Sequence, residues 1–74
     1  MNLCIGENIK FFRKSKDITQ EVLAEMLGIS FQSVSRWELG ICYPDIEFFP
    51  ILSQIFEVTV DKLLVVDHIA ETKK

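Results

Sequence analysis

The sequence predicts an all-α fold: one compact domain of five short helices. Three observations predict it. Apolar residues recur at helical spacing in separate segments, glycine or proline interrupts the chain between segments, and Ser, Thr or Asp precedes several of them as a candidate N-cap. The chain has 74 residues, 49% of them apolar, which is enough for one core. We therefore expect it to fold without disulfide or metal support.

Composition limits the classes of function. The longest apolar run has four residues, Leu63–Val66, whereas a membrane-spanning helix needs about 20. Glu7 and Lys10 interrupt the only stretch that could serve as a secretory signal, so a cytoplasmic location is expected. Cys4 and Cys42 lack the close spacing and histidine partners of a zinc site and are expected to be reduced packing thiols. No metal or cofactor is expected.

An enzyme is not expected either, because the single histidine, His68, has no nucleophile or ligand cluster at useful spacing. The net charge is −3, but it is unevenly distributed: residues 1–44 carry five basic and five acidic side chains, and residues 45–74 carry three and six. The N-terminal part could therefore face an anionic partner, with modest and strongly salt-dependent affinity.

The first helix is expected over residues 5–16, because Ile5, Ile9 and Phe12 fall on one stripe. Asp17 stands where a left-handed residue would close it, and Thr19 is a candidate N-cap.

A second helix follows from Gln20, with Leu23, Ala24 and Leu27 on one face, and Gly28 ends it. Ser30 can cap a third helix almost at once, and a connection this short is typical of a helix-turn-helix.

In the third helix Val34 and Trp37 point inward, and Gly40 ends it. Asp45 is expected to cap a fourth helix, with a kink or a shifted start at Pro50. Its apolar face is expected to comprise Ile46, Phe49, Leu52 and Phe56. Thr59 is expected to cap a short fifth helix through Val60, Leu63 and Leu64.

Residues 5–64 resemble the XRE family, the Cro and phage-repressor-like helix-turn-helix proteins. The resemblance rests on order and spacing: T-Q-x-x-L-A-x-x-L-G from Thr19, R-W-E-x-G from Arg36 and V-T-V-D-x-L-L from Val58. It implies a five-helix lambda-repressor-like domain, here residues 1–67 with a tail at 68–74, in which the second and third helices read DNA. Two departures stand out: Ile41 replaces a common lysine, and Glu57 replaces the usual glycine.

The resemblance also implies roles for individual residues. Arg13 and Glu38 match a family ion pair between the first and third helices, although two unrelated surface charges are the alternative. Gln20 is expected to contact phosphate together with the N-terminus of the second helix. Gln32 suits adenine, and Arg36 suits either guanine or phosphate.

Three further positions in the third helix have two interpretations each. Phe31 could contact a thymine methyl group or pack over the hinge between the helices. Ser33 and Ser35 could contact phosphate or bases, or be merely solvated.

The resemblance implies sequence-specific binding of double-stranded DNA by a transcriptional regulator, with a repressor favoured and residues 30–39 in the major groove. The alternative is a protein-interaction module, or an antitoxin-like protein, that keeps the fold with weak or no DNA binding. Both a complete regulator and the DNA-binding part of a longer one fit the sequence.

A homodimer on a pseudo-palindromic operator is expected, with the interface on the fifth helix and the tail. The reason is a set of apolar residues without an expected place in the core: Phe11, Phe48, Ile51, Val65 and Val66. The alternative is that Val65, Val66 and Ile69 extend the fifth helix back onto its own core.

Overall fold

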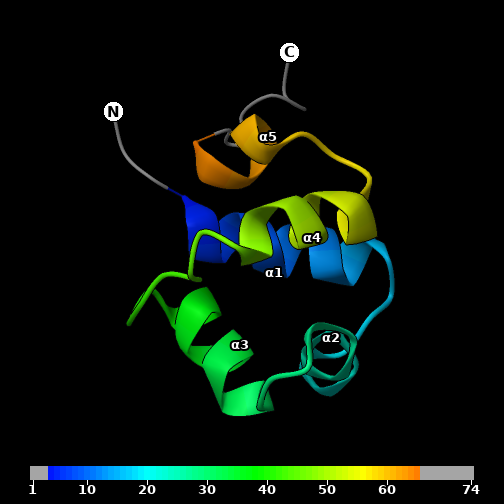
Figure 1. Ribbon diagram of the computed structural model, residues 1–74, viewed down its shortest axis with the longest axis vertical. Helices are drawn as coiled ribbons and strands as arrows, with labels where there is room; N and C mark the ends of the chain where they lie inside the picture. The colour runs from blue at the N-terminus through cyan, green and yellow to red at the C-terminus, as the bar shows by residue number, and fades with distance from the viewer. Residues whose placement is uncertain (1–3, 66–74) are drawn as a thin grey trace.

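The structure is a computed structural model that describes residues 4–65. Within that range the secondary structure consists of five helices and no strand, as the sequence predicts. They are α1 (Ile5–Ser15), α2 (Gln20–Leu27), α3 (Phe31–Leu39), α4 (Phe48–Phe56) and α5 (Val60–Leu64). In Figure 1, α1 and α4 occupy the middle of the molecule, α2 and α3 lie on one side of them and α5 lies on the other. None of the described helices is long and apolar enough to cross a bilayer.

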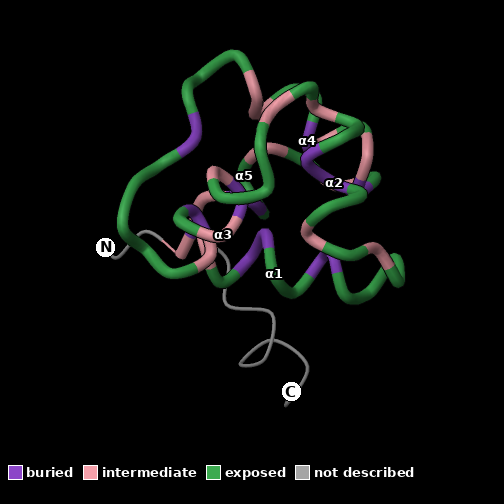
Figure 2. The backbone as a smooth tube through the Cα atoms, turned by 90° about the horizontal axis from the view of Figure 1, so that it is seen from below, coloured by how far each residue is buried: buried purple, intermediate pink, exposed green. Residues whose placement is uncertain are grey.

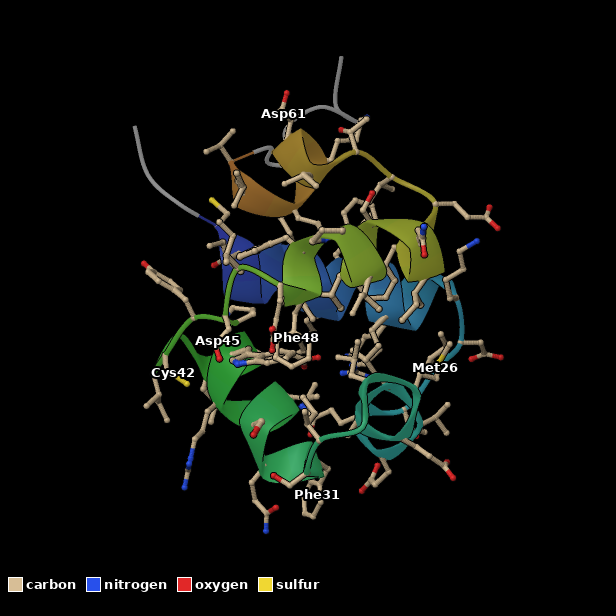
Figure 3. The ribbon with its side chains drawn as sticks, in the orientation of Figure 1. Met26, Phe31, Cys42, Asp45, Phe48 and Asp61 are labelled. Atoms are coloured by element: carbon tan, nitrogen blue, oxygen red, sulfur yellow. The ribbon has the colours of Figure 1, made fainter. Side chains whose placement is uncertain are left out.

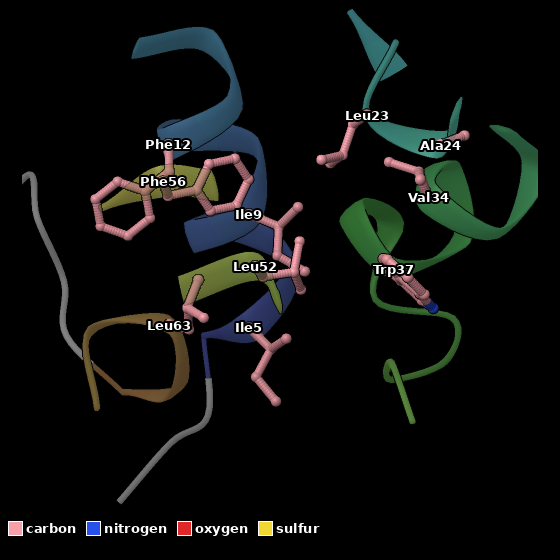
Figure 4. Packing of buried hydrophobic residues seen from close by; sticks show 10 residues of the cluster. All are labelled: Ile5, Ile9, Phe12, Leu23, Ala24, Val34, Trp37, Leu52, Phe56 and Leu63. Carbon is pink, nitrogen blue, oxygen red and sulfur yellow. The ribbon is translucent and has the colours of Figure 1, made fainter. Parts of the chain in front are cut away.

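The core joins these layers through ten buried apolar side chains. Figure 4 shows two groups of them: one on α1, α4 and α5, and one on α2 and α3. Phe12 of α1 and Phe56 of α4 stack in the first group, with ring centroids 5.8 Å apart. Val34 and Trp37 of α3 belong to the second group. The inward positions predicted from helical periodicity are therefore confirmed for α1 and α3.

The ends of the helices also follow the sequence. Thr19 Oγ1 accepts a hydrogen bond from the N–H of Val22 (3.1 Å), and Thr59 Oγ1 accepts one from the N–H of Lys62 (3.4 Å). Both threonines are therefore the N-caps that the sequence predicts. Asp17 has a φ of 62°, which confirms a left-handed residue after α1. Ser30 occupies the N-cap position of α3, but its side chain makes no capping hydrogen bond.

The start of α4 corrects one expectation. The helix begins at Phe48 rather than directly after Asp45, and Ile46 lies in the preceding loop with 85% of its surface exposed. Assigning Ile46 to the buried face of the helix was wrong. The later start makes Pro50 the third residue of α4, where its missing N–H has no helical acceptor to lose. The chain thus accommodates Pro50 by shifting the helix, one of the two outcomes that the sequence allowed.

Phe48 corrects a second expectation. It was expected to have no place in the core, but it packs against the core. It is half-buried, and its ring centroid lies 5.6 Å from that of Trp37. Phe11 and Ile51 do remain about two-fifths exposed. Val65 is half-buried, whereas Val66 lies outside the described residues, as does the tail to which a dimer interface was assigned.

Helix α5 is attached to α1 by hydrogen bonds from Asn8, a residue whose role the sequence did not predict. Asn8 is buried, and its Nδ2 donates to the carbonyl oxygens of Lys62 (2.9 Å) and Leu63 (3.0 Å). The N–H of Cys4 donates to the next carbonyl, that of Leu64 (2.8 Å). The start of α1 therefore binds three successive carbonyl groups at the end of α5, the end of a helix at which carbonyl groups need partners from outside it.

Glu57 adopts a left-handed conformation (φ 60°) at the end of α4, where the family resemblance led us to expect glycine. A side chain in this conformation costs roughly 1–2 kcal/mol relative to the right-handed region. Its carboxylate is solvent-exposed and lies 3.2 Å from Lys16 Nζ, and an ion pair at the surface offsets only a small part of that cost.

Candidate nucleic-acid interface

The second and third helices form a helix-turn-helix. Gly28 has a φ of 74°, so it turns the chain in the left-handed conformation that glycine adopts at little cost. The N–H of Ile29 then donates to the carbonyl of Ala24 (3.0 Å), which closes the end of α2. Leu23 and Ala24 of α2 face Val34 of α3 in the core (Figure 4). The two helices are therefore held together by a short turn and a buried apolar seam.

The opposite side of α3 faces solvent. Gln32 and Arg36 are both exposed, and their spacing of four residues puts them on the same helical face. Ser33 and Ser35 are half-buried, so they face outward less fully than the sequence predicts. Ser33 Oγ lies 3.4 Å from Ser30 Oγ, so Ser33 has a hydrogen-bond partner within the protein. Gln32 and Arg36 thus form a polar pair with the freedom to contact a ligand.

Phe31 is the first residue of α3 and is 44% exposed. Figure 3 shows it at the tip of the molecule formed by α2 and α3, remote from α5. It is not among the partly buried residues that pack against the core. The exposed end of α3 therefore combines an aromatic side chain with the polar pair.

A buried ion pair attaches this unit to α1. Arg13 Nε and Nη2 donate to Glu38 Oε2 (2.7 Å) and Oε1 (3.0 Å), so the contact is bidentate. The side chains are only 10% and 4% exposed. Arg13 Nη1 also donates to the carbonyl of Ile18 (2.8 Å), in the segment between α1 and α2. One guanidinium therefore joins α1, the start of the helix-turn-helix and the end of α3.

The hydrogen bonds that Arg13 donates to Glu38 are the main reason that the pKa of Arg13 is raised above its ordinary value. Burial opposes this, and the negative charges of Glu38 and Glu21 add to it. An arginine is charged at any ordinary pH. Titration of Arg13 therefore does not break this ion pair.

Gln20 belongs to the same network. Its Nε2 donates to Glu38 Oε1 (2.9 Å), so the start of α2 is tied to the end of α3. The sequence reading placed this amide on a phosphate and missed the contact with Glu38, because 18 residues separate the two positions. Its contact with phosphate stays a prediction, with one amide hydrogen now engaged inside the protein.

Gly6 sets the distance between α1 and α3. A Cβ atom at this position would lie 2.1 Å from the carbonyl oxygen of Trp37 and 3.2 Å from Cα of Glu38. Both of these are backbone atoms, which cannot rotate away as a flexible side chain can. The two helix backbones therefore come together at a point that admits only glycine. The sequence reading missed Gly6; a glycine inside a helical segment was the available signal.

The charge around the helix-turn-helix is mixed. Arg36 is exposed on α3, Lys10 and Lys14 are exposed on α1, and Lys16 is exposed directly after α1. On α2, however, Glu21 and Glu25 are exposed one turn apart. In the part of the chain that the structure describes, no group of three acidic, histidine or cysteine side chains could hold a metal ion.

Comparisons with known proteins agree with this geometry. The helix-turn-helix family model matches residues 9–63. The HTH-type transcriptional activator BcrR of Enterococcus faecalis is 43% identical over 59 residues, which cover 80% of this chain and 29% of BcrR. The antitoxin PezA of Streptococcus pneumoniae serotype 4 is 41% identical over 69 residues, which cover 93% of this chain and 40% of PezA.

Among solved structures, the P22 c2 repressor in complex with a synthetic operator superposes with a TM-score of 0.78. It is 35% identical, and the match covers 85% of this chain and 96% of that one. The chain spans between 29% and 58% of the lengths of the curated relatives it matches. The family model and the repressor match both extend over most of the chain, and the chain belongs to the XRE-type helix-turn-helix family.

Proposed function

We propose that this chain binds double-stranded DNA sequence-specifically and regulates transcription, with α3 in the major groove. The observation that carries the proposal is the two-sided character of α3: Val34 and Trp37 are buried, while Gln32 and Arg36 are exposed on one face. A helix held rigidly on one side can present the other to base edges, as recognition helices do. The P22 c2 repressor, which matches this chain, was solved in complex with a synthetic operator, which supports DNA binding.

Each exposed residue has a role that fits its chemistry. Gln32 would read adenine through N6 and N7, and Arg36 would bind guanine or phosphate. Gln20, with the N-terminus of α2, would contact phosphate and fix the register of the domain. Ser33 and Ser35 would add contacts to phosphate or bases from their half-buried positions.

The chain would act as a repressor rather than an enzyme, in the cytoplasm, and bind a pseudo-palindromic operator as a homodimer. Two-fold symmetry doubles the number of contacts that a small domain can make. The proposed interface is α5 with the segment after it. On α5 the described residues supply half-buried Val60 and Leu64 rather than a wide apolar face, so the tail would have to contribute most of the contact.

The competing function is a protein-interaction module or antitoxin-like protein with weak or no DNA binding. Two observations favour it: Ile41, where the family commonly has a cation, is 67% exposed, and the chain is net acidic. The exposed polar pair on α3 favours DNA instead, because Gln and Arg are side chains that pair with two base atoms at once.

The two functions separate in a binding experiment at low salt with Arg36→Ala and Gln32→Ala. We expect the parent chain to bind a DNA sequence selected from a random pool. Each substitution should weaken that binding about fivefold to 150-fold, which corresponds to the loss of about 1–3 kcal/mol expected for one two-pronged base contact. Fluorescence anisotropy with a labelled duplex measures the dissociation constants.

Gln54→Ala is the matched control, because it removes an exposed polar side chain from α4, outside α3 and outside the interface proposed on α5. It should change the affinity for the selected sequence little. Failure of the parent to enrich any sequence would contradict the proposed function and favour the interaction module. If Arg36→Ala weakens all duplexes equally, Arg36 binds phosphate rather than guanine.

A further inference from the structure

Phe31 is the most exposed of the six phenylalanines of the chain. Phe12 and Phe56 are buried and stacked on each other, and Phe48 packs against Trp37. Phe31, in contrast, is 44% exposed at the start of α3 and lies outside the core cluster. Phe31 therefore does not belong to the core, and it leaves an apolar ring at the surface proposed to face DNA (Figure 3). Packing of part of this ring over the hinge between α2 and α3 stays the alternative interpretation.

The chemistry of the major groove limits what such a ring can recognise. The base edges there are hydrogen-bond donors and acceptors, with one exception: the methyl group at C5 of thymine. The phenylalanine ring has no donor or acceptor with which to pair the polar edges. Its position matters as well, because the N-terminal residues of a recognition helix are the ones that reach base edges.

We infer that Phe31 is a specificity-determining residue that recognises the C5-methyl group of a pyrimidine in the operator. The inference rests on the proposed function, since it requires α3 to lie in the major groove. Phe31 immediately precedes Gln32, so the methyl-bearing base lies next to the base that Gln32 reads. Thymine and 5-methylcytosine carry the same group at the same place, and the ring itself does not distinguish them.

The test combines a change in the protein with a change in the DNA. The operator is first selected from a random pool with the parent chain. Each thymine in it is then replaced by deoxyuridine, which removes only the methyl group. We expect one thymine in each half-site at which this replacement weakens binding by the parent about fourfold, the factor that corresponds to about 0.8 kcal/mol for one buried methyl group.

Protein variants then assign that effect to Phe31. In Phe31→Ala the thymine and deoxyuridine operators should bind equally, whereas Phe31→Leu, which keeps an apolar side chain, should retain most of the discrimination. Met26→Ala is the matched control: Met26 is 51% exposed, is apolar and lies on α2. It should keep the full methyl dependence. Circular dichroism verifies that each variant is folded.

A second selection, with 5-methylcytosine in place of cytosine, identifies the source of the methyl group. Enrichment of thymine in both pools assigns the group to thymine, and enrichment of cytosine at that position only in the methylated pool assigns it to 5-methylcytosine.

A parent chain that binds its operator equally with and without every methyl group would overturn the inference while the proposed function stands. A parent chain that enriches no sequence overturns both. Equal methyl dependence in the parent and Phe31→Ala would show that another residue reads the group.

Discussion

Gly6→Ala should be strongly destabilising. The added Cβ would lie 2.1 Å from the carbonyl oxygen of Trp37, a backbone atom that moves only if α1 and α3 separate. Overpacking commonly costs about 1–3 kcal/mol when side chains can adjust, so we expect at least about 3 kcal/mol here. A domain of this size has roughly 4–11 kcal/mol of total stability, and a large share would be lost. Urea denaturation followed by circular dichroism measures the free energy of unfolding.

Gly28→Ala separates this clash from the general effect of replacing a glycine. Gly28 has a φ of 74°, but a Cβ there would meet no atom within 4 Å. Its replacement should cost only the roughly 1–2 kcal/mol of a left-handed alanine. A Gly6→Ala protein as stable as Gly28→Ala would show that α1 and α3 are not in contact at this point.

Arg13→Ala should be nearly as damaging, because it leaves the carboxylate of Glu38 buried without its bidentate partner. Removing one partner of a buried ion pair typically costs about 3–5 kcal/mol. The hydrogen bond from Gln20 to this carboxylate would then remain. The free energy of unfolding again provides the measurement, and it should fall far more than the corresponding value for Lys16→Ala.

Lys16→Ala is the matched control, since Lys16 pairs with Glu57 at 3.2 Å and the two side chains are 37% and 76% exposed, far more than those of Arg13 and Glu38. Exposed ion pairs contribute roughly 0–1 kcal/mol. The double substitution Arg13→Leu with Glu38→Leu should recover much of the loss, because no charge is then left buried without a partner. Equal effects of Arg13→Ala and Lys16→Ala would mean that the Arg13–Glu38 pair is not buried in solution.

The fold could be predicted from the sequence because most of its determinants are local. Helical spacing placed Ile5, Ile9 and Phe12 on one buried stripe, and threonine and glycine marked the ends of the helices. Ile46 was assigned wrongly because its spacing fits the apolar face of α4, although the helix begins two residues later. Pattern alone does not reveal which of several possible starts a helix with an internal proline will use.

The residues that the sequence reading missed act over long distances along the chain. Asn8 binds carbonyl groups more than 50 residues away, and Gly6 is required by the backbone of α3. Neither contact can be predicted from the local spacing of apolar residues. Within the candidate interface, the outward direction of Gln32 and Arg36 followed from the inward direction of Val34 and Trp37. The hydrogen bond from Gln20 to Glu38 was not predicted, because the sequence analysis assigned Gln20 to a phosphate and Glu38 to Arg13.

Nuclear magnetic resonance of the ¹⁵N-labelled chain, titrated with its selected DNA duplex, tests most directly whether α3 faces the DNA. The amide resonances of residues 31–36 and of the start of α2 should shift most, with those of α5 changing only through dimer formation. Shifts centred on α4 or on the exposed loop that precedes it (Figure 2), with α3 unaffected, would contradict the proposed placement of DNA on this surface.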